Sequence, residues 1–312
     1  MTEEKSKTRS KKYEIEIPSE GKIEIEENEI PEKKEHPILR KTLIGLAILV
    51  LIFLVYSFII CPNLLTIKEY KVSGTNLPSS FHGLKIVHFS DVHYGTKINK
   101  KQLDRIIKKI NEIKPDIVFF TGDLIDKNII TTEDIQKEVT ESLKEIKVSL
   151  YKYAVIGNED EKETYNKIMN DANFKVLDDE SVLLYYKENT PIVITGFSNI
   201  DSNPNYSILN TEIDGVDTSS LYNIVLFHES NAIDSVSTYD PELVLSSGTL
   251  GGKMKIFKPL FLPNNADKYY EDYYKINNTD YYISNGVGTT GVNLRFNNNP
   301  SINFYRLYKE EN

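Results

Sequence analysis

The stretch LKIVHFSDVHYG, from Leu84 to Gly95, decides the fold class of this chain. Its first six residues, 84–89, are mostly apolar and predict a buried strand. The strand leads directly into Asp91 and His93, two side chains of types that bind metals. In open α/β sheets, binding sites form beyond the carboxyl ends of the strands. The stretch therefore predicts an α/β domain with a functional site that begins at Asp91.

Beyond this stretch, apolar strands alternate with amphipathic helices. Asn99 is the predicted N-cap of one helix, and strands are predicted at residues 117–120 and 153–156, with a second helix between them. The apolar faces of the two helices are Leu103, Ile106, Ile107 and Ile110, and Ile135, Val139, Leu143 and Ile146. This order predicts β-α-β-α-β units with right-handed crossovers. Shorter strands are predicted at residues 182–186, 192–195, 223–227, 243–245, 281–284 and 302–308.

Three more predicted strands end in polar side chains. They lead into Gly122-Asp123-x-x-Asp126, Gly157-Asn158-Glu159-Asp160 and His228-Glu229. Taken singly, each group has a simpler explanation, because Gly-Asp and Gly-Asn are common turn pairs and a lone histidine is often a core residue, as predicted for His88. Their shared position at strand ends favours one convergent site. Carboxylate, amide and imidazole ligands together suit Mn²⁺, Fe²⁺ or Zn²⁺.

Composition narrows the classes of function. The chain has 312 residues and a net charge of −9, which argues against nucleic-acid binding through a basic surface. Cys61 is the single cysteine, so an intrachain disulfide and a Cys-rich zinc module are both excluded. Any transition metal must therefore be held by His, Asp, Glu or Asn.

The N-terminal part of the chain predicts a membrane anchor. Residues 1–41 are rich in charge and poor in apolar side chains, which predicts a disordered tail, although residues 13–17 alternate like a strand too short to be stable alone. Residues 42–61 form an uncharged, mostly aliphatic run long enough for a transmembrane helix. A buried core helix and a cleaved signal peptide are the less favoured alternatives.

The charges that flank this run predict its orientation. Lys33, Lys34, Arg40 and Lys41 precede it, whereas only Lys68 and Lys71 follow closely. Because cytoplasmic flanks carry the excess of Lys and Arg, we expect a single-pass protein of the cell membrane. Its N-terminus would be cytoplasmic and its large domain extracytoplasmic.

Between residues 66 and 308 the chain resembles the calcineurin-like metallophosphoesterases. The motifs that carry the resemblance are Asp91-x-His93, Gly122-Asp123-x-x-Asp126, Gly157-Asn158 and a later strand ending in His228. The blocks at 84–95 and 114–126 fit the family closely. The run YISNGVGTTG at 282–291, followed by Leu294-Arg295-Phe296, is similar to the membrane-anchored bacterial branch of the family.

The resemblance implies a fold, a reaction and a set of metal ligands. The fold would be a four-layer αββα sandwich, and the reaction would be hydrolysis of a phosphomonoester or phosphodiester. Asp91 and His93 would bind a first divalent ion, Asp123 would bridge two ions, and Asn158 and His228 would bind the second. The two ions would be Mn, Fe or Zn, and they would clamp the phosphate and acidify a bridging water for in-line attack.

The chain departs from the family pattern at several positions. Glu159 stands where the family has a histidine that assists the leaving group, and it could serve as a general acid only with a raised pKa. Gly248 and Leu250 stand in place of the two histidines of a Gly-His-x-His loop, and Lys253 replaces a glutamine. Each ion would lose one ligand, which predicts weaker metal binding.

These departures leave two functions open. One is a weakened metal-dependent phosphoesterase, with phospholipid-like or envelope-derived substrates at the lipid bilayer suggested by the anchor. The other is a catalytically inactive descendant that keeps the fold as a binding or sensing module at the membrane.

Overall fold

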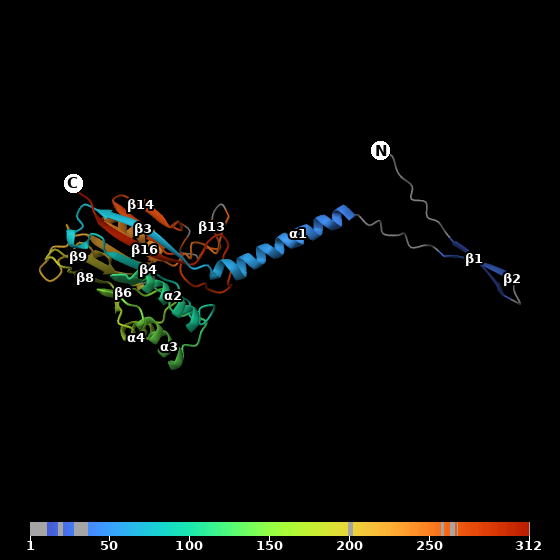
Figure 1. Ribbon diagram of the computed structural model, residues 1–312, viewed down its shortest axis with the longest axis horizontal. Helices are drawn as coiled ribbons and strands as arrows, with labels where there is room; N and C mark the ends of the chain where they lie inside the picture. The colour runs from blue at the N-terminus through green and yellow to red at the C-terminus, as the bar shows by residue number, and fades with distance from the viewer. Residues whose placement is uncertain are drawn as a thin grey trace. The chain divides into compact units, whose positions relative to one another are not determined.

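The computed structural model describes residues 11–17, 21–27, 37–198, 202–256, 259–262, 266 and 268–311 (Figure 1). It divides into two compact units, Met1–Ile52 and Phe53–Asn312, and each is described by itself. The second unit carries the candidate site.

Two six-stranded sheets form the second unit. The first sheet has the order β3-β16-β4-β5-β6-β7, and the second has the order β14-β15-β11-β10-β9-β8. The first comprises β3 (Thr66–Gly74), β4 (Lys85–Phe89), β5 (Ile117–Phe120), β6 (Tyr151–Ala154), β7 (Lys175–Val176) and β16 (Ser301–Lys309). The second comprises β8 (Glu180–Leu184), β9 (Ile192–Gly196), β10 (Asn223–Glu229), β11 (Leu243–Ser247), β14 (Tyr273–Ile276) and β15 (Thr279–Ile283). A separate pair joins β12 (Met254–Lys255) to β13 (Pro259–Leu260).

Alternating side chains divide the core into layers. Along β5, Ile117 and Phe119 pack in the cluster shared with the second sheet, whereas Val118 and Phe120 pack with the helices. These helices are α2 (Lys100–Ile113), α3 (Glu133–Lys144) and α4 (Lys162–Asp171), which lie together along one side (Figure 1). The other face of the second sheet packs against α5 (Ile233–Val236) and two short 3₁₀ turns. The predicted αββα sandwich is therefore confirmed, with a thin fourth layer.

The local features that predicted α2 are present in the structure. The Asn99 side chain accepts a hydrogen bond from the Gln102 backbone, and the Gln102 side chain accepts one from the Asn99 backbone, which is a capping box. The strand predicted at residues 153–156 lies two residues earlier, at β6. Sequence patterns did not predict α4 or β3. The β3 strand pairs in parallel with β16, more than 200 residues further along the chain, so its partner is set by the tertiary fold.

The N-terminal unit differs from the predicted disordered tail. The strands β1 (Lys11–Ile17) and β2 (Gly21–Glu27) pair antiparallel, with Tyr13 opposite Ile25. The first alternating segment alone predicts no stable strand, and the second segment supplies the missing partner. Residues 1–10, 18–20 and 28–36 of the predicted tail lie outside the described residues.

The apolar run forms a helix that starts earlier than predicted. The helix α1 (Pro37–Val55) begins with a proline, whose missing N–H costs nothing at this position. It continues as a π turn at Tyr56–Ile60 and a 3₁₀ turn at Cys61–Asn63. None of the α1 residues is buried, and the whole segment is long and apolar enough to cross a membrane.

The end of this helical segment contacts the domain within the second unit. The Phe53 and Tyr56 rings lie 5.0 and 5.6 Å from the Phe296 ring, centroid to centroid. The backbone N–H of Arg295 donates to the carbonyl of Ser57 at 3.0 Å. The loop that carries Arg295 is therefore tied to the last turns of the apolar segment.

Candidate metal centre

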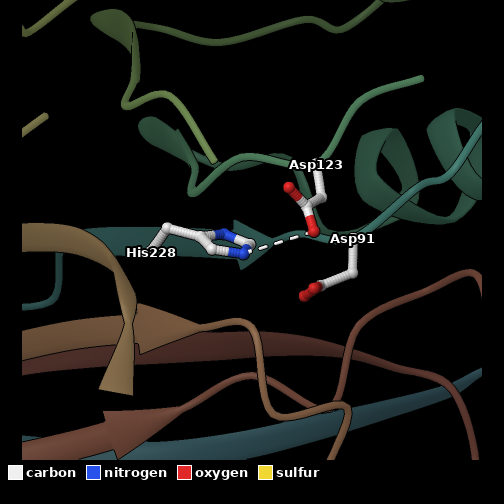
Figure 2. A group of neighbouring side chains, drawn as sticks. All are labelled: Asp91, Asp123 and His228. Atoms are coloured by element: carbon white, nitrogen blue, oxygen red, sulfur yellow. Dashed lines mark ion pairs between the residues drawn. The ribbon is translucent and has the colours of Figure 1, made fainter. Parts of the chain in front are cut away.

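Three predicted ligands meet where the two sheets adjoin. Asp91 follows β4, Asp123 follows β5 and His228 lies near the end of β10, and all three residues are buried. One ligand atom from each lies within 4.8 Å of the others. Figure 2 shows the His228 ring facing the Asp123 carboxylate, with the Asp91 carboxylate beside them. Strands of both sheets therefore supply one metal-ligand cluster.

The hydrogen bonds of His228 leave one ring nitrogen free for a ligand. Its Nδ1 lies 2.6 Å from the carbonyl oxygen of Thr121, which can only accept, so Nδ1 carries the proton. Its Nε2 lies 3.3 Å from Oδ2 of Asp123 and has no hydrogen-bond partner among the described residues. A backbone carbonyl that fixes the tautomer in this way is typical of metal-ligating histidines. The cluster therefore fits a divalent ion.

Backbone conformation holds the carboxylates in place. Asp91, His93 and Asp123 have φ angles of 52°, 45° and 59°, in the left-handed region. Such conformations cost about 1 kcal/mol or more each and tend to gather at functional sites. Gly157 is needed for a close approach, because a Cβ there would clash with Oδ1 of Asp123. The loops after β5 and β6 are thus packed tightly around the cluster.

Burial and the neighbouring charges shift the pKa values of Asp123 and His228 in opposite directions. Burial acts to raise the pKa of Asp123, but the nearby His228 and His93 outweigh it and lower that pKa to about 2. Burial acts to lower the pKa of His228, but Asp123 and Asp91 outweigh it and raise that pKa well above its usual value. In the metal-free protein the two side chains therefore form a buried ion pair. By contrast, His88 is a fully buried core residue, as predicted, and burial lowers its pKa to about 3.

Asp160 is a structural residue that sequence reasoning did not single out. Its carboxylate accepts hydrogen bonds from the backbone N–H groups of Asp123, Leu124 and Gly157 at 2.8, 2.8 and 2.9 Å. Burial and the charge of Asp123 raise its pKa to about 6. An acidic residue two positions after the Gly157-Asn158 turn was the available signal. Asp160 therefore joins the loops that follow β5 and β6.

Glu159 does not have the surroundings of a general acid. Its Oε1 lies 2.6 Å from Lys127 Nζ, and its Oε2 lies 3.5 Å from His93 Nδ1. Contact with His93, and then with Lys127, lowers the pKa of Glu159 despite burial. A general acid here required a raised pKa, so the predicted role does not fit these contacts. A second group of close potential ligands consists of His93, Asp126 and Glu159.

The remaining predicted positions lie at the edge of the cluster. Asn158 is exposed, on the loop next to Gly157. Gly248 has a φ of 75°, and a Cβ there would lie 3.0 Å from Nε2 of His228. Leu250 is 4% exposed, and its Cδ2 and the Asp91 side chain both lie against Gly286. The segment that replaces the histidine loop thus lies against the cluster, and it carries the apolar side chain of Leu250.

Arg295 supports the far side of the site. This fully buried guanidinium donates to the carbonyls of Asn285, Gly288 and Asn298 at 2.8, 2.7 and 3.3 Å. The Gly288 N–H in turn donates to the Asp91 carbonyl at 2.8 Å. Arg295 therefore orders the loop that lies against Asp91.

A two-sheet sandwich with carboxylate and imidazole side chains at its strand ends defines an α/β domain with a candidate site for a divalent metal ion. A family model described as calcineurin-like phosphoesterase matches residues 84–286. The chain belongs to the calcineurin-like phosphoesterase family.

Individual proteins are also similar to this chain. The uncharacterized metallophosphoesterase YkuE of Bacillus subtilis is 28% identical over 259 residues, which cover 81% of this chain and 88% of that protein. A transmembrane protein with metallophosphoesterase domain from Danio rerio is 24% identical over 84% of this chain and 62% of its own length. Among solved structures, TT1561 of Thermus thermophilus has a TM-score of 0.43 and 11% identity, over 65% of this chain and 90% of that one.

Proposed function

We propose that this chain is a membrane-anchored, metal-dependent phosphoesterase with a weakened dinuclear centre. The observation that carries the proposal is the buried convergence of Asp91, Asp123 and His228, with Nε2 of His228 turned toward the Asp123 carboxylate. Divalent ions, when bound, supply Lewis-acid polarisation of a phosphoryl oxygen and a nucleophile at neutral pH. Membership of the family supports phosphoester bonds as the target.

The chain's own residues provide the support for such a centre. The Thr121 carbonyl keeps the proton of neutral His228 on Nδ1, so that Nε2 stays available. Asp160 positions the Asp123 backbone through a hydrogen bond of 2.8 Å. The Ser90 hydroxyl donates to Asp91 and so orients its carboxylate. The ligands are therefore held in place before an ion binds.

A lipid surface is the proposed setting of the reaction. Exposed apolar side chains cluster on segments next to the end of the helical anchor: Ile256, Leu260, Phe261 and Val292. Met254 pairs with both Leu260 and Phe296, and Phe296 contacts Phe53 of the helix. This placement supports a face of the domain that lies on the bilayer, and with it a phospholipid-like or envelope-derived substrate. The excess of Lys and Arg before the apolar run supports a position outside the cytoplasm.

A binding or sensing module without turnover is the second candidate. The replacement of the loop histidines by Gly248 and Leu250 favours it, because both positions adjoin the cluster and neither supplies a ligand. Lys253 also points its ammonium elsewhere, toward the Thr290 carbonyl at 2.8 Å.

Turnover of a generic phosphodiester with Mn²⁺ decides between these functions. The full-length chain in detergent should hydrolyse bis(p-nitrophenyl) phosphate, and Asp91→Asn should reduce the rate to background. The exposed Asp171→Asn at the end of α4 is the matched control and should keep the wild-type rate. A wild-type protein with no turnover at millimolar Mn²⁺ would favour the binding module.

A further inference from the structure

The second ion cannot be held by the full ligand set that the family resemblance implies. One of the family's loop histidines is replaced by Gly248, and Asn158, which the resemblance assigns to this ion, is exposed. Yet a different group of ligand types lies on the other side of the His93 ring. The Nε2 atom of His93 lies 3.7 Å from Oδ2 of Asp123, and the Nδ1 atom of His93 lies 3.5 Å from Oε2 of Glu159.

We propose that His93, Asp126 and Glu159 hold a divalent cation at a position separate from the Asp91–Asp123–His228 cluster. One ligand atom from each of the three lies within 4.8 Å of the others. Two carboxylate oxygens and an imidazole nitrogen suit Mn²⁺, Fe²⁺ or Zn²⁺. This metal position extends the proposed function. The role of the second ion in catalysis rests on that function.

In each carboxylate of this group, one oxygen accepts hydrogen bonds, whereas the other has no hydrogen-bond partner among the described residues. Asn128 donates to Oδ1 of Asp126 from its backbone N and its Nδ2, at 3.0 and 2.9 Å. Lys127 contacts Oε1 of Glu159 at 2.6 Å. The other oxygens, Oδ2 of Asp126 and Oε2 of Glu159, are buried and have no hydrogen-bond partner among the described residues.

Free buried oxygens of this kind are costly unless something binds them. Asp126 is 1% exposed, and the Glu159 side chain is 10% exposed. An unpaired buried polar group costs about 1–3 kcal/mol, and a charged one costs more. His93 Nδ1, facing Glu159, also lacks a hydrogen-bond partner among the described residues. A cation would satisfy all three atoms at once.

An adjoining cavity gives such an ion a way in and room for water ligands. The cavity has a volume of about 290 Å³, and Asp126, Lys127 and Glu159 line it together with apolar residues that include Ile129 and Ile168. Lys127 is largely exposed, so its side chain can move away from Glu159 when a cation arrives. The site is therefore accessible from solvent without opening the core.

Titration of the metal-free, full-length protein in detergent with Mn²⁺ tests the proposal. Isothermal calorimetry and the electron paramagnetic resonance signal of free Mn²⁺ would count the bound ions. The wild type should bind two. Glu159→Gln and Asp126→Asn should each weaken one of them by roughly tenfold or more, and Asp91→Asn should weaken the other.

The control is Glu161→Gln, which changes an acid that lines the same cavity but lies outside the ligand group. It should bind both ions as the wild type does, and circular dichroism should show that all the variants are folded. Glu159→Gln is the more informative variant, because the ion pairs of the Glu159 side chain among the described residues are those with Lys127 and His93.

Two outcomes would overturn the proposal: wild-type binding of every ion by both Glu159→Gln and Asp126→Asn, or no binding by the wild type at millimolar Mn²⁺. The proposed function fails separately. If the ions bind and respond as expected but bis(p-nitrophenyl) phosphate is not hydrolysed, the metal position stands and the hydrolase does not. If turnover is found while Glu159→Gln keeps both ions, the hydrolase stands and the metal position does not.

Discussion

Nε2 of His228 lies 3.3 Å from Oδ2 of Asp123, and both side chains are buried between strands of different sheets. In the metal-free protein this contact joins the two halves of the sandwich as an ion pair. The two side chains attract each other only when both are charged, so the stability that the ion pair provides depends on pH.

The two pKa shifts set the pH range of this stabilisation. The raised pKa of His228 stabilises the folded chain below pH 6.5, and this contribution is lost as the pH rises through the folded-state value. The lowered pKa of Asp123 stabilises above pH 3.8, and this contribution is lost as the pH falls toward 2. We expect the full contribution between pH 3.8 and 6.5.

The difference between wild type and His228→Gln isolates this effect. In EDTA, the thermal unfolding midpoint of the wild type should exceed that of the variant. The difference should be largest between pH 3.8 and 6.5. The margin should shrink at alkaline pH, where His228 is neutral in both the folded and the unfolded state. Circular dichroism of the full-length protein in detergent measures it, and a margin that does not change with pH would contradict the ion pair.

Restoring the two loop histidines should have unequal effects. Leu250 lies near Asp91, so Leu250→His should place an imidazole beside the carboxylate and tighten Mn²⁺ binding. Gly248 has a φ of 75°, and a side chain there would press on His228. Gly248→His should therefore destabilise the protein by about 1 kcal/mol or more and not improve binding.

Mn²⁺ titration and thermal unfolding of the two single variants measure this prediction. Leu250→Met, which keeps an apolar side chain without a strong ligand, is the control and should bind Mn²⁺ as the wild type does. Tighter binding by Gly248→His than by Leu250→His would show that the loop adopts the family conformation when an ion is present.

Arg295 should matter both to stability and to the metal centre. Arg295→Met leaves the carbonyls of Asn285 and Gly288 without their buried donor, at a cost of roughly 2–4 kcal/mol. Gly288 donates a backbone hydrogen bond to Asp91, so disorder of this loop should lower the affinity for Mn²⁺ as well. Urea unfolding and Mn²⁺ titration give the two readouts.

An exposed arginine provides the comparison for this variant. Arg306 pairs with Glu69 at 3.4 Å on the surface, and Arg306→Met should change stability by less than about 1 kcal/mol. Equal effects of the two substitutions would mean that the carbonyl contacts of Arg295 are unimportant.

The apolar segment at Pro37–Asn63 should anchor the protein. After cell breakage, the full-length chain should stay in the membrane fraction through carbonate washing, because a spanning helix is held by apolar burial and not by charge. Protease added to intact cells without their wall should degrade the large domain. Recovery of the chain in the carbonate supernatant would contradict the anchor, and cleavage of the N-terminal tail alone would reverse the predicted orientation.

The sequence by itself determined the local elements and the positions where ligands follow them. The apolar runs at β4 and β5 predict strands because their side chains must be buried on both faces, and the polar residues after them fall at strand ends by necessity. Asp91, Asp123 and His228 could therefore be predicted to meet. The apolar face of α2 and its Asn99 cap were readable for the same reason, since both depend on near neighbours in the chain.

Only the tertiary structure decided how the loop side chains are turned and which of them share a site. Glu159 faces His93 and Lys127, Asn158 next to it is exposed, and Leu250 packs near Asp91. These directions depend on the left-handed backbone at the strand ends and on contacts between loops far apart in sequence. A local pattern fixes where a strand ends, but the packing of distant loops against one another fixes where the next side chains point.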